Sequence, residues 1–321
     1  MNSATFFTPV QTDLQEVETL LHSQAEHVQP DLRAALEHLL SSGGKRIRPV
    51  VCLLTGQMLN APHENLITLA AAVEMLHTAT LVHDDLIDGA LLRRGMPTLN
   101  TRWSPAATIL TGDFMFARAA KLAADSDNLP LMKLFAETLA TIVSGELTQL
   151  FAARGVISRE NYAKRIYAKT ASLFEMATRA AAMVSPENEP VVEAMRQCGY
   201  HLGMAFQIVD DILDFTGEQE TVGKPVGSDL LQGLVTLPAI YYAEAHPNDP
   251  DVLCLTGGCY TEQERMERLV QSIRGSSATS RSMREAQGFI DKALGILKTM
   301  PEGLERQALE DLASYIVNRN I

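Results

Sequence analysis

The sequence has 321 residues, of which 46% are hydrophobic and 21% are charged, and its formal net charge is −12. This composition predicts a folded chain with a large core, and its acidic balance argues against nucleic-acid binding. No basic start followed by an apolar run opens the chain, and the apolar stretch 66–82 carries Glu74 and His77. We therefore expect a cytoplasmic protein without a signal peptide or a transmembrane helix.

Apolar residues recur at three- and four-residue spacing along most of the chain, and no convincing two-residue alternation is present. The sequence therefore predicts an all-α fold, which we expect to form one domain over residues 1–321. The glycine-rich segment 217–233 predicts a long loop of the kind that often covers a functional site. The predicted helices cover residues 14–21, 32–40, 67–81, 131–150, 162–183, 191–215, 265–273 and 290–300.

Residues 43–49 read Gly-Gly-Lys-Arg-Ile-Arg-Pro and bring three cations to a predicted helix start. A helix N-terminus offers unpaired N–H groups and the positive end of the helix dipole, so this segment predicts an anion cradle. The segment is not a Walker A loop, because the spacing and the terminal Lys-Ser/Thr are missing.

Two segments read Asp-Asp-x-x-Asp, at residues 84–88 and 210–214, and each follows a strongly apolar helical stretch. On a helix, the first and last aspartates of such a segment lie about 5–6 Å apart on one face, where like charges repel each other. Two such segments in apolar surroundings need a compensating cation. Mg²⁺ suits carboxylate oxygens and shares its remaining positions with water and substrate phosphates.

Basic residues accompany both acidic segments. Arg93 and Arg94 follow the first, Lys169 precedes Thr170 in an otherwise apolar helix, and Lys224 lies in the glycine-rich loop after the second. Arginine and lysine side chains suit phosphate oxygens. Acidic segments with basic neighbours indicate an anionic substrate that metal ions bridge to the protein.

Six blocks of this sequence together resemble the trans-type polyprenyl diphosphate synthases, which include octaprenyl, solanesyl and geranylgeranyl diphosphate synthases. They cover most of residues 40–240. The blocks are GGKRIRP (43–49), EMLHTATLVHDDLIDGALLRRGMPT (74–98), TGDFMFARA (111–119), AKTASLFE (168–175), FQIVDDILDFTG (206–217) and GKPVGSDLLQGLVTLP (223–238).

The resemblance implies mostly antiparallel helices around a deep central cavity, usually in a homodimer. It implies a reaction that condenses isopentenyl diphosphate with an allylic prenyl diphosphate into a longer all-trans chain. It also implies that several Mg²⁺ ions bind Asp84, Asp88, Asp210 and Asp214, with Asp85 and Asp211 nearby. The allylic diphosphate would contact Arg93, Lys169 and Lys224, with Thr170 and Gln207 at the reacting end, and isopentenyl diphosphate would contact Lys45, Arg48, His77 and Arg94.

Product length in this family depends on the residue five positions before the first aspartate, where a bulky aromatic gives short products. Here the position is Ala79, with Thr80 next, so we expect products longer than geranylgeranyl diphosphate, with Met75 or Leu76 among the residues that stop the chain. A geranylgeranyl or farnesyl diphosphate synthase is the alternative. Gly89 and Leu234 stand where many relatives carry a charge, and we expect them to change affinity or metal dependence without loss of activity.

Three other classes of protein compete with this interpretation. Glu74-x-x-His77 fits half of the ligand pattern of a di-iron helical bundle, but no second copy of the motif occurs. A terpene cyclase would share the first aspartate segment, and a non-catalytic partner subunit would share the fold.

Overall fold

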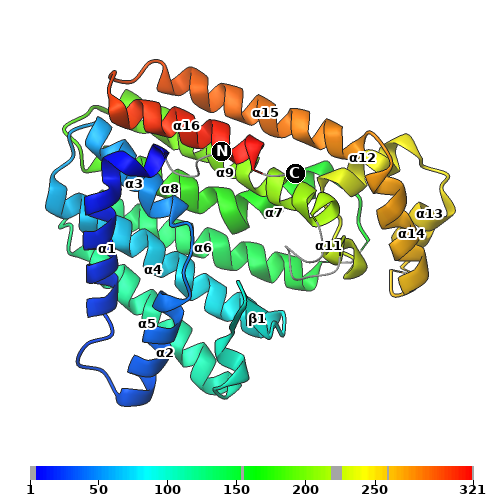
Figure 1. The fold of residues 1–321 in the computed structure, drawn as a ribbon, viewed down its shortest axis with the longest axis horizontal. Helices are drawn as coiled ribbons and strands as arrows, with labels where there is room; N and C mark the ends of the chain where they lie inside the picture. Colours follow the sequence, from blue (N-terminus) through cyan, green and yellow to red (C-terminus); the bar gives the residue numbers. More distant parts are fainter. Residues whose placement is uncertain (1–4, 153–154, 218–225, 259, 320–321) are drawn as a thin grey trace. The chain divides into compact units, whose positions relative to one another are not determined.

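The computed structural model describes residues 5–152, 155–217, 226–258 and 260–319 (Figure 1). These residues fold almost entirely as helices, which confirms the predicted all-α class. Their contacts divide the chain into two compact units that are assembled from alternating segments. The prediction of one domain over the whole chain stays a prediction. Unit 1 comprises Met1–Thr138, Leu173–Arg196 and Thr299–Asp311, and unit 2 comprises Leu139–Ser172, Gln197–Lys298 and Leu312–Ile321.

Unit 1 is built around α4 (His63–Ile87), which packs against α5, α3 and α1. The helix is apolar on most sides, and most of its surface is accordingly buried. It is long and apolar enough to cross a membrane, but 72% of that stretch is buried within the fold, as expected of a core helix. The other elements that begin in this unit are η1 (Thr5–Val10), α1 (Gln11–Ser23), α2 (Pro30–Ser41), α3 (Ile47–Met58), β1 (Leu92–Arg93), β2 (Met96–Pro97), η2 (Leu99–Thr101), α5 (Pro105–Ala124), α6 (Leu129–Phe151), α9 (Glu189–Thr216) and α16 (Leu304–Asn318).

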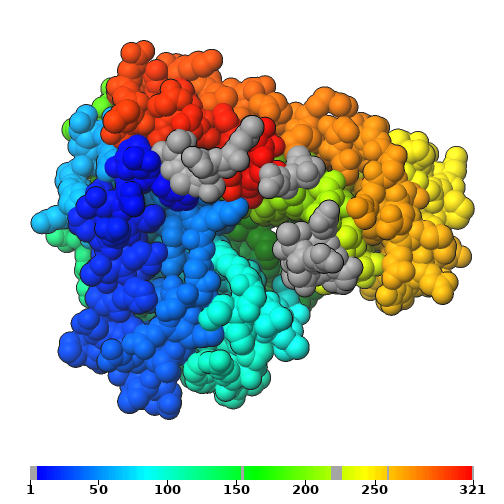
Figure 2. Space-filling model, viewed as in Figure 1, coloured from blue at the N-terminus to red at the C-terminus, as the bar shows by residue number. Residues whose placement is uncertain are grey.

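A short hairpin, which the sequence did not predict, follows α4. Its two strands pair Leu92 with Pro97 and Arg93 with Met96. The two residues between them, Arg94 and Gly95, both have positive φ angles, at 52° and 77°. Two such residues form the mirror-image turn whose twist matches that of paired strands. The hairpin lies on the molecular surface (cyan in Figure 2), and Arg94 is exposed at its turn.

Unit 2 contains the C-terminal parts of α6, α9 and α16 and a set of shorter helices. Helix α12 packs against α15, α14 and α7, while α13 and α11 pack against α14. Gly227 makes the last contact possible, because a Cβ added there would lie 2.4 Å from a methyl group of Val270. The elements that begin in this unit are α7 (Arg159–Ile166), η3 (Tyr167–Ala171), α8 (Ser172–Met183), α11 (Ser228–Leu231), α12 (Leu237–Ala245), α13 (Pro250–Thr256), α14 (Gln263–Arg274) and α15 (Ala278–Leu297).

The predicted helices agree with the observed ones for α1, α2, α4, α6, α9 and α14, and the helix predicted over 290–300 is the C-terminal half of α15. Helices α3, α5, α12, α13 and α16 went unpredicted, as did α11, which lies inside the predicted loop 217–233. The segment 162–183, predicted as one helix, consists of α7, a π-helical turn (η3) and α8. A π turn inserts one extra residue into a helix and occurs often at functional sites. Here it contains Lys169 and Thr170.

Candidate functional site

The glycine-rich basic segment forms the loop directly before α3, as predicted. Lys45 is exposed on this loop, and Arg48 lies in the first turn of the helix. Nη1 of Arg48 is 3.1 Å from Nε2 of His77 on α4. Since arginine can only donate, Nε2 accepts this hydrogen bond. Burial, followed by the charge of Arg48, holds the pKa of His77 well below its usual value, so the imidazole stays neutral beside the cations.

The hairpin brings Arg94 to the same loop. Nη1 of Arg94 donates to the carbonyl oxygen of Gly43. A Cβ added to Gly44 would lie 2.4 Å from the same guanidinium nitrogen. The structure therefore gathers Lys45, Arg48, His77 and Arg94, the four residues predicted to hold one diphosphate, within unit 1.

The first aspartate segment ends α4. Asp84 and Asp85 lie in its last turn, and Asp88 is its C-cap. Asp85 is buried, and both of its carboxylate oxygens accept hydrogen bonds from Arg93, at 2.7 to 2.9 Å. Asp84 is half-buried and Asp88 is exposed. The burial pattern separates an inward aspartate that fixes Arg93 from two outer aspartates that a cation can reach.

Gly89 ends the helix immediately after this segment. Its φ angle is +63°, in the left-handed region that favours glycine. The amide of Gly89 donates to the carbonyl of Leu86, and the amide of Ala90 donates to the carbonyl of Asp85. This double bond pattern is the Schellman motif that caps helix C-termini. The departure at this position thus replaces a charge with a helix stop.

The second aspartate segment lies within α9 in unit 2, and the second of its three aspartates, Asp211, anchors a buried hydrogen-bond chain. Asp211 accepts from the hydroxyl of Tyr162 on α7 at 2.8 Å and from Nε2 of Gln207 at 2.8 Å. Oε1 of Gln207 in turn accepts from the hydroxyl of Thr170 at 2.6 Å. Burial, together with the charge of Asp229, raises the pKa of Asp211 to about 7. The chain fixes the amide of Gln207 and the direction of the Thr170 hydroxyl.

The outer aspartates of this segment have different partners. Oδ1 of Asp210 lies 2.9 Å from Nη1 of Arg319. Nη2 of the same arginine donates a hydrogen bond to the carbonyl oxygen of Phe206. Asp214 accepts from the amide and the hydroxyl of Ser228 and from the amide of Asp229. Asp214 thereby holds the start of α11 against α9.

Lys169 forms an ion pair with Glu146 on α6, at 2.8 Å. The π turn places Lys169 on the exposed side and the adjacent Thr170 on the buried side. Lys224 lies outside the described residues. Leu234, the second departure, lines a cavity of about 750 Å³ between α6, α7 and residues 233–235. The residues that line this cavity do not include Lys169, Thr170 or Gln207 within the described part of unit 2.

The residues predicted to control product length lie on α4. Ala79, Met75 and Leu76 are buried, and Thr80 is half-buried with its hydroxyl donating to the carbonyl of His77. His83, directly before Asp84, contacts α5: its Nε2 lies 3.1 Å from the carbonyl oxygen of Ile109. His83 thus ties α4 to its neighbouring helix.

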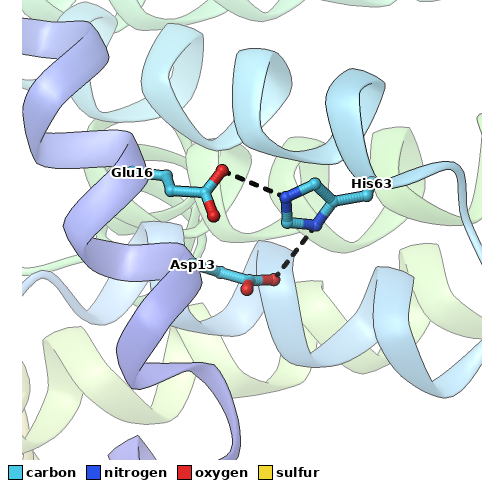
Figure 3. Close-up of side chains that lie close together, drawn as sticks. All are labelled: Asp13, Glu16 and His63. Atoms are coloured by element: carbon cyan, nitrogen blue, oxygen red, sulfur yellow. Dashed lines mark hydrogen bonds and ion pairs between the residues drawn. The ribbon is translucent and has the colours of Figure 1, made fainter.

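Among the described residues, one trio of metal-type ligands brings its atoms within 4.8 Å of one another, and it belongs to neither aspartate segment (Figure 3). Nε2 of His63 lies 3.1 Å from Glu16, and Nδ1 lies 3.7 Å from Asp13. The two carboxylates thus face opposite edges of one imidazole ring, so one ion cannot bind both of them and the ring as it stands. Asp13 also accepts from Gln57 at 2.6 Å. These contacts tie α1 to α3 and α4.

The di-iron alternative loses its support in this geometry. Oε1 of Glu74 accepts from Arg46 at 2.7 Å, and His77 faces Arg48. Both side chains of the Glu-x-x-His pattern are therefore engaged by guanidinium groups, which would repel a metal ion.

Sequence reasoning missed the residues that support the site. Tyr162, Glu146 and Ser228 are ordinary residue types without a local signal, and only the packing brings them to Asp211, Lys169 and Asp214. Arg319 lies more than a hundred residues after Asp210 in the sequence, and their contact came only from the structure.

An all-helical chain with two Asp-Asp-x-x-Asp helix segments, each accompanied by basic residues, has the features of the trans-prenyltransferases. Residues 29–273 match the model of the polyprenyl synthetase family. The chain belongs to this family of divalent-metal-dependent enzymes, and it is a trans-prenyltransferase.

Curated relatives are 33–38% identical to this chain over the aligned residues. Heptaprenyl diphosphate synthase component 2 of Geobacillus stearothermophilus is 38% identical over 309 residues, which cover 96% of each chain. The all-trans-nonaprenyl-diphosphate synthase (geranyl-diphosphate specific) of Rhodobacter capsulatus is 38% identical over 88% of this chain and 87% of its own.

Solved structures agree on the fold. Heptaprenyl diphosphate synthase of Staphylococcus aureus has a TM-score of 0.91 at 33% identity and covers 97% of this chain and 99% of its own. A polyprenyl synthase of Caulobacter crescentus, complexed with calcium and isoprenyl diphosphate, has a TM-score of 0.91 at 34% identity over 99% of this chain and 98% of its own. The isoprenoid-synthase fold class is therefore confirmed.

Proposed function

We propose that this enzyme condenses isopentenyl diphosphate with an allylic prenyl diphosphate to give an all-trans polyprenyl diphosphate longer than C20. The observation that carries the proposal is that each unit holds one aspartate segment in contact with an arginine, Arg93 at Asp85 and Arg319 at Asp210. Relatives named for heptaprenyl, octaprenyl, nonaprenyl and solanesyl products support the length.

Mg²⁺ fits the residues present, because every candidate ligand is a carboxylate oxygen, the donor type that hard cations prefer. We infer that Asp84, Asp88 and Asp210 supply most of the ligands. Asp85, Asp211 and Asp214 accept hydrogen bonds that hold neighbouring elements, whereas the side chain of Asp210 is 40% exposed and its ion pair with Arg319 can yield to a metal ion. Asp211 and Asp214 would supply further carboxylate ligands to the same ions. Bound Mg²⁺ supplies positive charge that stabilises the departing diphosphate.

The basic residues divide between two diphosphates. Arg93, Lys169 and Lys224 hold the allylic diphosphate, and Arg93 is aimed by Asp85. Lys45, Arg48, His77 and Arg94 hold isopentenyl diphosphate.

The reaction breaks the allylic C–O bond and forms a C–C bond between that carbon and the isopentenyl double bond. A proton then leaves the new chain for the released diphosphate. The hydroxyl of Thr170 donates a hydrogen bond to Gln207. The lone pairs of the Thr170 oxygen therefore point elsewhere and can face the electron-poor carbon. Apolar walls exclude the water that would otherwise capture this carbon.

Product length follows from α4 under this proposal. Ala79 and Thr80 leave room for the growing chain, and Met75 or Leu76 stops it one turn deeper. A geranylgeranyl diphosphate synthase is the second candidate, and structural neighbours of that name support it.

We also propose a cytoplasmic homodimer. Helix α6 exposes Val143, Leu147, Leu150 and Phe151 at the spacing of one helix face, and Phe151 is 81% exposed. Such a contiguous apolar surface is typical of a subunit interface. The name component 2 of a relative points to a different subunit as the competing occupant.

The test is incubation of the purified chain alone with Mg²⁺, isopentenyl diphosphate and farnesyl diphosphate, followed by mass spectrometry of the products. We expect a ladder of elongated diphosphates that ends beyond C20. Elongation only after a second protein is added would show that the chain is one component of a hetero-oligomer, and cyclic hydrocarbons would favour a terpene cyclase. An Asp84→Asn variant is the matched control and should lose elongation.

A further inference from the structure

The loop that carries Lys45 and Arg48 contains a third cation whose role the diphosphate contacts do not explain. Arg46 is the N-cap of α3 and has a φ of 46° and a ψ of 34°, in the left-handed region. A residue with a Cβ rarely adopts this conformation unless its surroundings impose it. The side chain of Arg46 is only 10% exposed, so it points into the fold, whereas the preceding Lys45 is exposed.

Three elements of unit 1 hold this guanidinium. Nε and Nη2 donate to Glu18 on α1 at 2.5 and 3.2 Å, and Nη1 donates to Glu74 on α4 at 2.7 Å. Nη2 also donates to the carbonyl of Leu40 in α2, at 3.0 Å. Four directed hydrogen bonds to α1, α2 and α4 fix both the position of Arg46 and the left-handed turn of its backbone.

Glu74 connects this anchor to the cations around it. Its carboxyl is buried one helical turn before His77, and burial raises its pKa while Arg46 lowers it. The charge of Arg48 also lowers the pKa of Glu74, and the charges of Arg48 and Arg94 both lower the pKa of His77. A buried carboxylate among several guanidinium groups reduces their mutual repulsion, so the cradle can exist before its anion arrives.

We propose that Arg46 is a positioning residue that, through Glu18 and Glu74, sets the loop so that Lys45 and Arg48 converge on one diphosphate. Arg94 holds the other end of the loop at Gly43, so the loop is fixed at two points. This inference rests on the proposed function, because it takes isopentenyl diphosphate as the anion. No contact of Arg46 with substrate is involved.

The experiment compares Arg46→Met, Arg46→Lys and Glu18→Gln with the wild type and with Arg33→Met. Arg33 is a suitable control because it forms an exposed ion pair with Glu37 on α2, in the same unit. Steady-state kinetics give KM for each substrate, and circular dichroism gives the melting temperature.

We expect Arg46→Met to raise KM for isopentenyl diphosphate by about tenfold or more, the usual cost of losing a group that orients ligands. KM for farnesyl diphosphate and kcat at saturation should stay within about twofold, a change too small to reflect a lost contact. Arg46→Lys keeps the charge but loses the forked guanidinium, so its KM for isopentenyl diphosphate should lie between those of the wild type and Arg46→Met. Glu18→Gln leaves the buried pair with Glu74 intact and should give a smaller increase in the same KM. If both KM values rise together, or neither rises, Arg46 has only a structural role and the proposal is wrong.

A second readout separates this proposal from the proposed function. Calorimetric titration with inorganic pyrophosphate in the absence of divalent ions measures the basic cradle without turnover. We expect binding about tenfold weaker for Arg46→Met than for the wild type or Arg33→Met. If the wild type fails to elongate any chain, the proposed function fails, and the pyrophosphate titration still decides the role of Arg46. Equal pyrophosphate affinities would refute that role.

Discussion

The buried pair of Tyr162 and Asp211 makes a prediction whose size depends on pH. Replacing Tyr162 with Phe removes the hydroxyl that donates to Asp211 at 2.8 Å and leaves the ring in place. The pKa of Asp211 is raised to about 7 by burial and by Asp229, whereas burial holds the pKa of Tyr162 well above its usual value. The tyrosine therefore donates throughout, and only the carboxyl changes charge.

The sign follows from the raised pKa of Asp211. The stability that its protonated form contributes is fully present below the unfolded pKa of about 4 and is lost as the pH rises through about 7. At about pH 5.5 the lost hydrogen bond is between neutral groups and costs about 0.5–1.5 kcal/mol of unfolding free energy. At about pH 8.5 the acceptor is ionised and the cost becomes about 1.5–3 kcal/mol.

Urea unfolding of the metal-free chain in EDTA measures the loss of unfolding free energy at each of the two pH values. The matched control is Tyr242→Phe, because its hydroxyl donates to Asp249 at the same distance of 2.8 Å. Desolvation raises the pKa of Asp249, but hydrogen bonds from Tyr242 and from backbone amides outweigh it, so this pKa is lowered. Asp249 is thus ionised at both pH values, and the control should lose the same free energy at each. Equal losses at both pH values for Tyr162→Phe would refute the assignment of a raised pKa to Asp211.

Three further predictions concern the site and its frame. Ala79→Phe should shorten the longest product seen by mass spectrometry, whereas Ala79→Ser should not, and an unchanged length in Ala79→Phe would reject the position of the tunnel. Gly112→Ala places a Cβ 2.4 Å from Nε2 of His83 and should cost about 1–3 kcal/mol of unfolding free energy; the double variant with His83→Ala should recover most of it, and no recovery would show that another contact is responsible. Removal of divalent ions with EDTA should abolish elongation without unfolding the chain, and excess Mg²⁺ should restore it; activity that persists in EDTA would contradict the metal requirement.

The long amphipathic or apolar helices could be predicted from the sequence because their periodicity is strong over several turns. Helix α5 was missed although Ser104 caps it and Pro105 occupies its first position, which together form a recognisable start signal. The π turn at Tyr167–Ala171 could not be predicted, because one inserted residue leaves the apolar pattern of α7 and α8 nearly continuous. The hairpin was missed because Arg94-Gly95 is a less common sequence for its turn than Asn-Gly.

The site was predictable as far as charge clusters mark it. The carboxylates and cations stand out because such residues are costly to place in apolar helices without a ligand. The hydrogen bonds of Tyr162, Glu74 and Ser228 could not be read in the same way. They join residues far apart in the chain, and their residue types are common in helices and loops without any function.

The most direct test of the central claim is the location of the metal ions themselves. Crystals grown with Mn²⁺ and a non-reactive allylic diphosphate analogue would reveal the ions by anomalous scattering. We predict ions at both aspartate segments, with Asp84 or Asp88 among the ligands in the first and Asp210 among the ligands in the second. Ions bound to only one of the two aspartate segments, or to Asp13, Glu16 and His63 instead, would contradict the claim that both segments serve one reaction.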